Sequence, residues 1–197
     1  MNLLAHFYLS GPDEGIRFGN FIGDFVKGRQ FEQFPAAVAT GIRLHRQIDQ
    51  YTDTHAVVTA SKRRLQPRYR HYAGVIVDIY YDHFLSANWL QYHHVPLADF
   101  SQQCYATISQ QQHLLPERAA RMFPYMQKGN WLYHYQFVEG IGQALAGMSR
   151  RSTFESGIEH ATEELQAHYD QFASEFHAFF PQLQAFAKQW LQENGPA

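Results

Sequence analysis

Apolar residues recur every three to four positions through nearly the whole chain, and glycine or proline separates one such segment from the next. This spacing is typical of helices that bury one face, whereas the two-residue alternation of half-buried strands is rare here. Gly28 is expected to end one helix and Pro67 to interrupt another. The pattern predicts helices over residues 2–10, 13–27, 34–52, 55–66, 69–93, the stretch between Pro96 and Pro116, 117–127, 130–148, 154–180 and 181–192.

No linker, fixed-period repeat or low-complexity tract divides the 197 residues. With 45% hydrophobic and 16% aromatic residues, the chain can bury a sizeable core. We therefore expect a single all-α domain spanning residues 1–197, built from about eight to ten helices.

The charge balance argues against a nucleic-acid-binding protein, because the formal net charge is -2 and no long basic run occurs. The single cysteine, Cys104, can form no internal disulfide and is expected to be a buried, inert thiol. The first residues lack the pattern of a signal peptide, and their apolar run is too short to span a membrane. A cytoplasmic location is the expectation.

The stretch GIRLHRQIDQYTDTH carries His45, Asp49 and Asp53 at successive four-residue steps. On a helix these side chains are surface neighbours, so one imidazole and two carboxylates would line one stripe. Such a stripe offers half of a coordination shell for a divalent metal. The alternative is a solvated helix face, with Arg43 and Arg46 close by.

Two aspartates interrupt the most apolar of the predicted helices, within GVIVDIYYDHFL. Asp78 and Asp82 would share one face, where buried carboxylates are costly and repel each other unless a cation lies between them. A metal held with the help of the adjacent His83 would resolve that cost. The alternative is a pair of structural ion pairs with arginines such as Arg43 or Arg46.

Two further polar pairs lie on the predicted N-terminal helices at four-residue spacing, Asn2 with His6 and Asn20 with Asp24. A lone histidine such as His6 is more often a hydrogen-bonded core residue than a ligand. Four helices nevertheless each bring an Asp or a His to an interior face. This oxygen-rich set suits Mg²⁺ or Mn²⁺, with Fe²⁺ possible, and favours metal-assisted phosphoester hydrolysis. No nucleophile elbow, phosphate loop, dinucleotide fingerprint or cysteine-based zinc spacing occurs.

Several segments together resemble the acyl carrier protein phosphodiesterase family: MNLLAHFYLS, GNFIGDFVKG, GIRLHRQIDQYTD, DIYYDHFLSANW and LQAHYDQFASEFHAFFPQL. The likeness covers nearly the whole chain in order. It implies a fold similar to the helical, metal-dependent HD phosphohydrolases, although an adjacent His-Asp pair is absent. It also implies hydrolysis of holo-acyl carrier protein, of fatty acid biosynthesis, to apo-protein and 4'-phosphopantetheine, with Mn²⁺ as preferred cation.

On this basis we expect a metal-activated water to attack the phosphorus in line. Asp53 or Asp78 would orient that water or a ligating histidine, and Asp24 is a further catalytic candidate. The leaving serine oxygen would take its proton from a histidine or from water. The expected metal ligands are His6, Asp24, His45, Asp49, Asp82 and His83.

An acidic carrier protein would need a basic docking surface, although any one cation of this chain could equally be ordinary solvated surface. Two other functions stay open from the residues: a phosphohydrolase acting on a small phosphoester or nucleotide, and a non-enzymatic helical interaction protein. The expected docking residues are Arg43, Arg46, Lys62, Arg63, Arg64, Arg150 and Arg151, with Arg68 and Arg70 nearby.

Overall fold

The computed structural model describes residues 1–151 and 156–195, and in these ranges every regular element is a helix. The all-α expectation is confirmed, while the single domain over 1–197 and the likeness to the HD phosphohydrolases stay predictions. The α-helices are α1 (Leu3–Leu9), α2 (Glu14–Ile22), α3 (Ala36–Thr54), α4 (Ala56–Tyr69), α5 (Ala73–Ala87), α6 (Leu97–Gln110), α7 (Glu117–Lys128), α8 (Trp131–His134), α9 (Val138–Ser149), α10 (Thr162–Ala167) and α11 (Tyr169–Asn194). Short 3₁₀ helices cover Gly23–Phe25, Gln30–Gln33, Arg70–Tyr72, Trp89–Gln91, Gln112–Leu114 and Ile158–His160.

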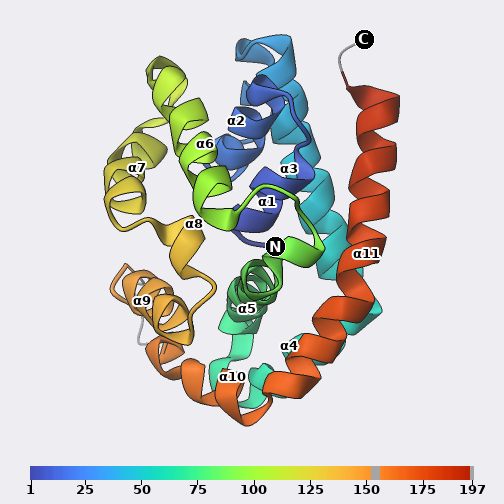
Figure 1. Ribbon diagram of the computed structural model, residues 1–197, viewed down its shortest axis with the longest axis vertical. Coiled ribbons are helices and arrows are strands. Elements are labelled where there is room, and N and C mark those ends of the chain that lie inside the picture. The colour runs from blue at the N-terminus through green and yellow to red at the C-terminus, as the bar shows by residue number, and fades with distance from the viewer. Residues whose placement is uncertain (152–155, 196–197) are drawn as a thin grey trace.

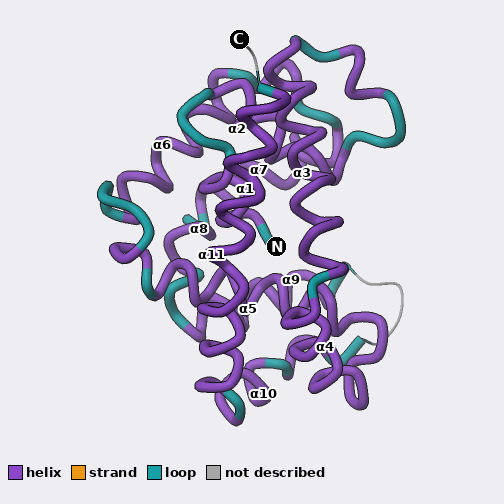
Figure 2. Tube along the Cα trace, turned by 90° about the vertical axis from the view of Figure 1, so that its right-hand side faces the viewer, coloured by secondary structure: helices purple, strands orange, loops and turns teal. Residues whose placement is uncertain are grey.

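The short helix α1 lies inside the molecule, between α2, α5 and α11, which it contacts. The N-terminus lies near the middle of the molecule in both views (Figures 1 and 2). The long helix α11 runs along one edge and packs against α3, α4 and α5 (Figure 1). No described helix is both long enough and apolar enough to cross a bilayer.

Helices α2 and α3 pack more tightly than ordinary side chains would allow, because each contributes a glycine at the crossing. A Cβ on Gly19 would overlap the carbonyl oxygen of Val38, and one on Gly41 would overlap that of Ile16. The two backbones are therefore in direct contact. This crossing fixes where the polar residues of α2 stand relative to those of α3.

Two prolines expected to separate helices lie inside them instead. Pro67 is within α4 and Pro181 is within α11, so the expected break at 181 does not occur. The described part of the expected helix 154–180 is instead divided among the turn Ile158–His160, α10 and the start of α11. Proline removes a backbone donor, but burial of Leu65 and Tyr69 around the first, and of Phe180 and Leu183 around the second, offsets that loss. The residue at which this segment was expected to begin, 154, lies outside the described residues.

Three predicted helices are shorter than their patterns suggest. The segment 13–27 ends as an α-helix at Ile22 and tightens into the 3₁₀ turn Gly23–Phe25. In the segment 69–93 the α-helical part is α5. Arg70, just before it, adopts φ 49°, a value outside the helical region, so the helix begins after this residue. The segment 130–148 divides into α8 and α9. The apolar spacing in the sequence continues through each of these helix ends, so the sequence pattern did not predict where the helices end.

Candidate metal centre

Three side chains from two helices meet beneath the surface between α1 and α3. His6 Nε2 lies 3.2 Å from Asp49 Oδ1, and His45 Nε2 lies 3.1 Å from Asp49 Oδ2. One ligand atom from each of the three residues falls within 4.8 Å of the others. In the ranges 1–151 and 156–195, no other three His, Cys, Asp or Glu side chains approach as closely.

A fourth polar residue, Asp24, stands at the outer edge of this group. Its Oδ1 lies 3.1 Å from His45 Nε2, and its side chain is 73% exposed. The preceding Gly23 makes room for the histidine, since a Cβ there would overlap the ring of His45. The early end of α2 therefore serves the site: the 3₁₀ turn presents Asp24 and admits the ring.

The inner edges of both rings are held by one residue of α2. His6 Nδ1 donates to Asn20 Oδ1 at 2.7 Å, and His45 Nδ1 donates to the main-chain oxygen of Asn20 at 2.8 Å. Both imidazoles therefore turn their Nε2 atoms toward Asp49. The sequence showed Asn20 only as the partner of Asp24 at four-residue spacing, so its contact with the two histidines was missed.

Burial and the neighbouring polar groups act in opposite directions on the ionisation of Asp49 and His45. Burial opposes ionisation of Asp49, but its contacts with the rings of His45 and His6 hold its pKa below the usual range. Burial likewise opposes protonation of His45, yet Asp24 and Asp49 together raise its pKa to about 9. Burial and the neighbouring charge of His45 lower the pKa of His6. The group thus contains the Asp49 carboxylate and a protonated His45 ring, while protonation of the His6 ring is unfavourable.

The donors fit a divalent cation. His6 Nε2 is buried without a hydrogen-bond partner and faces a carboxylate oxygen. If both rings were protonated to pair with Asp49, two stacked imidazolium ions would stand 4.0 Å apart. A single cation among the two Nε2 atoms and the carboxylate would satisfy all three without that repulsion. Two imidazoles and a carboxylate are a donor set used for Mn²⁺ and Fe²⁺ as well as Zn²⁺.

Comparison of the sequence with known proteins identifies a family. The family model described as acyl carrier protein phosphodiesterase matches residues 1–183. The chain belongs to the acyl carrier protein phosphodiesterase family. A relative of that name from Photorhabdus laumondii is 33% identical over 186 residues, covering 93% of each chain. One from Escherichia coli strain HS is 34% identical over 191 residues, covering 95% of this chain and 97% of the relative. No solved structure matches the chain significantly.

In this member of the acyl carrier protein phosphodiesterase family, the two aspartates of α5 have other partners than a metal. Asp82 accepts hydrogen bonds from the backbone N–H groups of Leu4, at 2.7 Å, and Ala5, at 3.2 Å. It therefore caps the N-terminus of α1, whose dipole favours a carboxylate. Asp78 lies 3.1 Å from the α-amino group of Met1. In the structure, the partners of the two aspartates are the first backbone N–H groups of α1 and the α-amino group of Met1, whereas the sequence suggested a cation or arginines.

His83 points away from the centre, so the structure does not bring it together with His6, His45 and Asp49. Its Nδ1 donates to the carbonyl of Tyr135 at 2.8 Å, and its Nε2 lies 3.0 Å from the Tyr169 hydroxyl. Adjacent residues on a helix point about 100° apart. Asp82 faces α1, so His83 faces α8 and α11 instead. Burial lowers the pKa of His83, which keeps the ring neutral.

Asp53 lies apart from the group, because each four-residue step along α3 turns about 40° beyond a full turn of the helix. It is exposed near the end of α3 and pairs with Lys62 of α4 at 2.6 Å. Of the expected ligands, the structure brings together His6, His45, Asp49 and Asp24, and it leaves Asp82 and His83 elsewhere. Their roles as ligands and catalysts stay predictions.

Two of the expected docking arginines are used within the fold of this family member. Arg43 donates to Thr40 at 3.2 Å and lies over the ring of Trp190. Arg46 donates to the carbonyl of Val26 at 2.9 Å, which ties α3 to the loop that follows Asp24. Both are half-buried, so they are less available to a partner than their charge suggests.

The remaining basic residues differ in whether an acidic side chain of the described ranges pairs with them. Arg64 makes two hydrogen bonds to Glu175, at 2.8 and 2.7 Å, and Lys62 is occupied by Asp53. Arg63 is exposed, and no acidic side chain of the described ranges lies within ion-pair distance of it. Arg150 and Arg151 are exposed after α9.

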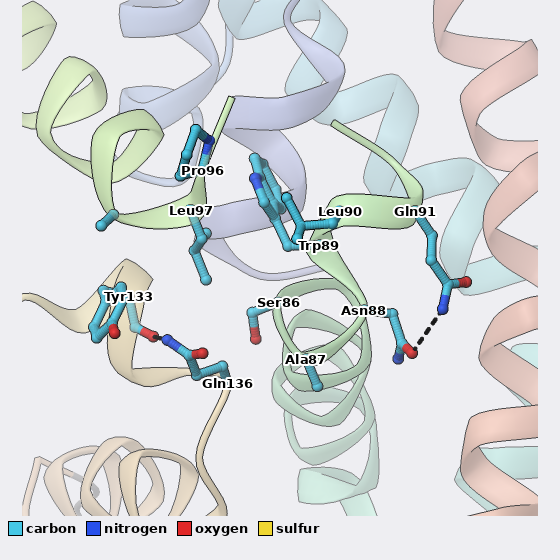
Figure 3. A pocket seen from close by; sticks show the side chains of 11 residues that line it. Ser86, Ala87, Asn88, Trp89, Leu90, Gln91, Pro96, Leu97, Tyr133 and Gln136 are labelled. Atoms are coloured by element: carbon cyan, nitrogen blue, oxygen red, sulfur yellow. Dashed lines mark hydrogen bonds between the residues drawn. The ribbon is translucent and has the colours of Figure 1, made fainter. Parts of the chain in front are cut away.

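Two surface hollows lie away from these side chains. One, of about 460 Å³, is lined by the end of α5, the Trp89–Gln91 turn, the start of α6 and residues near α8 (Figure 3). The other, of about 530 Å³, lies between α1 and α11 and includes Tyr8. Tyr8 is two residues after His6 and so points to the opposite side of α1. None of the expected ligands lines either hollow.

Proposed function

We propose that this chain hydrolyses the phosphodiester of holo-acyl carrier protein, releasing apo-acyl carrier protein and 4'-phosphopantetheine, with a divalent cation as cofactor. Membership of the acyl carrier protein phosphodiesterase family supports the substrate. The observation that carries the cofactor is the buried His6 Nε2, which has no hydrogen-bond partner and faces Asp49 Oδ1. His6, His45 and Asp49 would hold the ion, and Mn²⁺ is the first choice.

The residues of the centre have distinct tasks in this proposal. The two buried rings and Asp49 fix the position of the ion, since they come from helices that the fold holds rigidly. When bound, a divalent cation screens the phosphate oxygens and lowers the pKa of water. Asp24 is exposed at the rim and its hydrogen bond from His45 lowers its pKa, so it is a carboxylate at neutral pH. It is placed to orient a water molecule toward an incoming phosphate.

The partner is an acidic protein, and exposed cations near the centre are the candidates for steering it. Arg63 is our first candidate, because no acidic side chain of the described residues pairs with it and it follows Lys62, which pairs with Asp53 near the end of α3. Arg150 and Arg151 form a second basic site. A carrier-protein substrate and the buried single thiol of Cys104 both agree with a cytoplasmic location.

The deciding experiment uses the purified chain, holo-acyl carrier protein and Mn²⁺, with the intact mass of the carrier as readout. We expect loss of one phosphopantetheine from the carrier, and no loss with excess chelator. Hydrolysis of nucleotides without any change in carrier mass would instead support a small-molecule phosphohydrolase. Absence of turnover together with absence of Mn²⁺ binding would support a helical interaction protein.

A further inference from the structure

Asn20 is completely buried, and every one of its side-chain polar groups is used. Its Oδ1 accepts from His6 Nδ1 at 2.7 Å. Its Nδ2 donates to the carbonyl of His6 and to Ser10 Oγ, both at 2.9 Å. Because both amide hydrogens are given to oxygen acceptors, the orientation of the side-chain amide is fixed, and its oxygen faces the ring.

The main chain of the same residue holds the second ring. His45 Nδ1 donates to the carbonyl of Asn20 at 2.8 Å. Asn20 lies in the last turn of α2, where backbone carbonyls have no partner within the helix and the helix dipole is negative. A protonated ring nitrogen is the natural partner for such a carbonyl.

Together these two contacts determine the tautomer of both histidines. An acceptor at each Nδ1 requires the proton to be there, which leaves the Nε2 lone pair of each neutral ring as the available ligand atom. Both Nε2 atoms face Asp49, where a cation would take the place of any proton on them. The opposite tautomer would put an N–H toward a cation and would bring two acceptors together at Nδ1.

We propose that Asn20 is a positioning residue that orients both imidazoles of the centre at once, His6 through its side chain and His45 through its main chain. It does not touch the cation or the substrate. The inference rests on the proposed function, because it concerns a cation held by these rings. Partners of this kind around a ligating histidine commonly contribute about 10–100-fold to metal affinity.

The two contacts respond differently to substitution, which makes the proposal testable. Asn20→Leu removes the acceptor for His6 but keeps the carbonyl that holds His45. The matched control is Ser10→Ala, which removes one hydrogen bond from the same buried amide without touching a ring. Asn20→Asp is the conservative variant, since it keeps an oxygen for His6 Nδ1 and loses the amide donors.

Two measurements on the purified chain read the effect. Calorimetric titration with Mn²⁺ is expected to show affinity about 10–100-fold lower for Asn20→Leu, a smaller loss for Asn20→Asp, and a change within about twofold for Ser10→Ala. Nitrogen-15 NMR of the metal-free wild-type chain is expected to show Nδ1–H on both rings. In metal-free Asn20→Leu, the His6 signals should change while the His45 signals keep their wild-type pattern.

Equal affinity of Asn20→Leu and wild type, or equal losses in Asn20→Leu and Ser10→Ala, would overturn the proposal. If Asn20→Leu does not fold, the wild-type spectrum and Asn20→Asp still decide, since a ring that lacks a proton on Nδ1 contradicts the proposal. Failure of the proposed function has a different result: the wild-type chain itself would bind no Mn²⁺ or leave the carrier intact, whatever the ring tautomers are.

Discussion

The imidazole rings of His6 and His45 lie face to face, with centroids 4.0 Å apart and an angle of 19° between their planes. His6 belongs to a helix of seven residues, and His45 belongs to one of nineteen. The contact between the two rings therefore depends on the packing of α1 against α2 and α5. Groups that fix α1 and the rings are as important to the centre as the ligand atoms themselves.

Asp49→Asn should remove the centre while leaving the fold intact. The amide supplies one neutral oxygen in place of the carboxylate that faces both Nε2 atoms, so the charge that would bind a cation is lost. We expect Mn²⁺-dependent turnover of holo-acyl carrier protein to fall by more than the roughly 10–100-fold typical of losing an outer partner. Intact mass of the carrier over time measures the rate.

The control is Asp99→Asn, which removes an equal charge from an exposed position in the first turn of α6. It should keep its rate within about twofold and its helical circular dichroism unchanged. Full activity in Asp49→Asn would exclude Asp49 from the centre. Loss of helical signal in Asp49→Asn would show that the residue acts on the fold instead.

Gly23→Ala should disturb the centre by taking space from His45. The backbone at Gly23 is in the right-handed helical region, so alanine causes no backbone strain. The added methyl would overlap the ring, which must then leave its place beside Asp24 and Asp49. We expect weaker binding of Mn²⁺, by about tenfold or more, measured by calorimetric titration.

Gly147→Ala in α9 is the matched control for this substitution. The nearest atom to its new Cβ is an Arg150 side-chain nitrogen 3.9 Å away, and alanine favours a helix more than glycine does. It should bind Mn²⁺ as the wild-type chain does. Unchanged binding by Gly23→Ala would mean that the His45 ring can bind the ion from a different position.

Sequence reasoning found the α3 stripe because helical spacing is a local property. His45 and Asp49 are one turn apart in any helix, so their common face followed from the sequence alone. His6 came from another helix, and its nearness to them depends on the packing of α1 against α2. Neither local spacing nor residue type carries that information.

Asp82 and His83 lie apart from the centre for a physical reason. A carboxylate in an apolar helix needs a positive partner, and the sequence identifies the need without identifying the partner. The backbone N–H groups that begin α1 have no sequence signal of their own. Asn20 was missed for the same reason, since half of its contribution comes from a main-chain carbonyl.

Arg63→Ala and Arg64→Ala should have different effects although the residues are neighbours. Arg63 is exposed, so its loss should raise the KM for holo-acyl carrier protein and weaken the dependence of KM on ionic strength. Arg64 is held by Glu175 and lies over Phe172, so its loss should lower the free energy of unfolding by about 1–3 kcal/mol. Steady-state kinetics at several salt concentrations and denaturant unfolding measure the two effects.

An unchanged KM in Arg63→Ala at low salt would argue against docking at this position. A raised KM in Arg64→Ala, at a temperature where that variant is folded, would mean that the half-buried pair of Arg64 and Glu175 also contacts the carrier. The wild-type chain should itself show a KM that rises with salt, because long-range attraction between unlike charges is screened.

Asp82 should make the fold less stable as pH rises, in contrast to most carboxylates. Burial raises its pKa from 3.8 to about 7 although Leu4 and Ala5 donate to it. The folded chain therefore holds a proton that the unfolded chain has released between these two values, and the stability it contributes is lost as pH rises through about 7. In Asp82→Asn, which can still accept one of the N–H groups, this contribution is absent. Denaturant unfolding of the metal-free proteins should show the wild-type minus variant free energy falling by up to ~1.4 kcal/mol per pH unit in that window. A constant or rising difference would mean that the helix α1 terminus keeps Asp82 ionised.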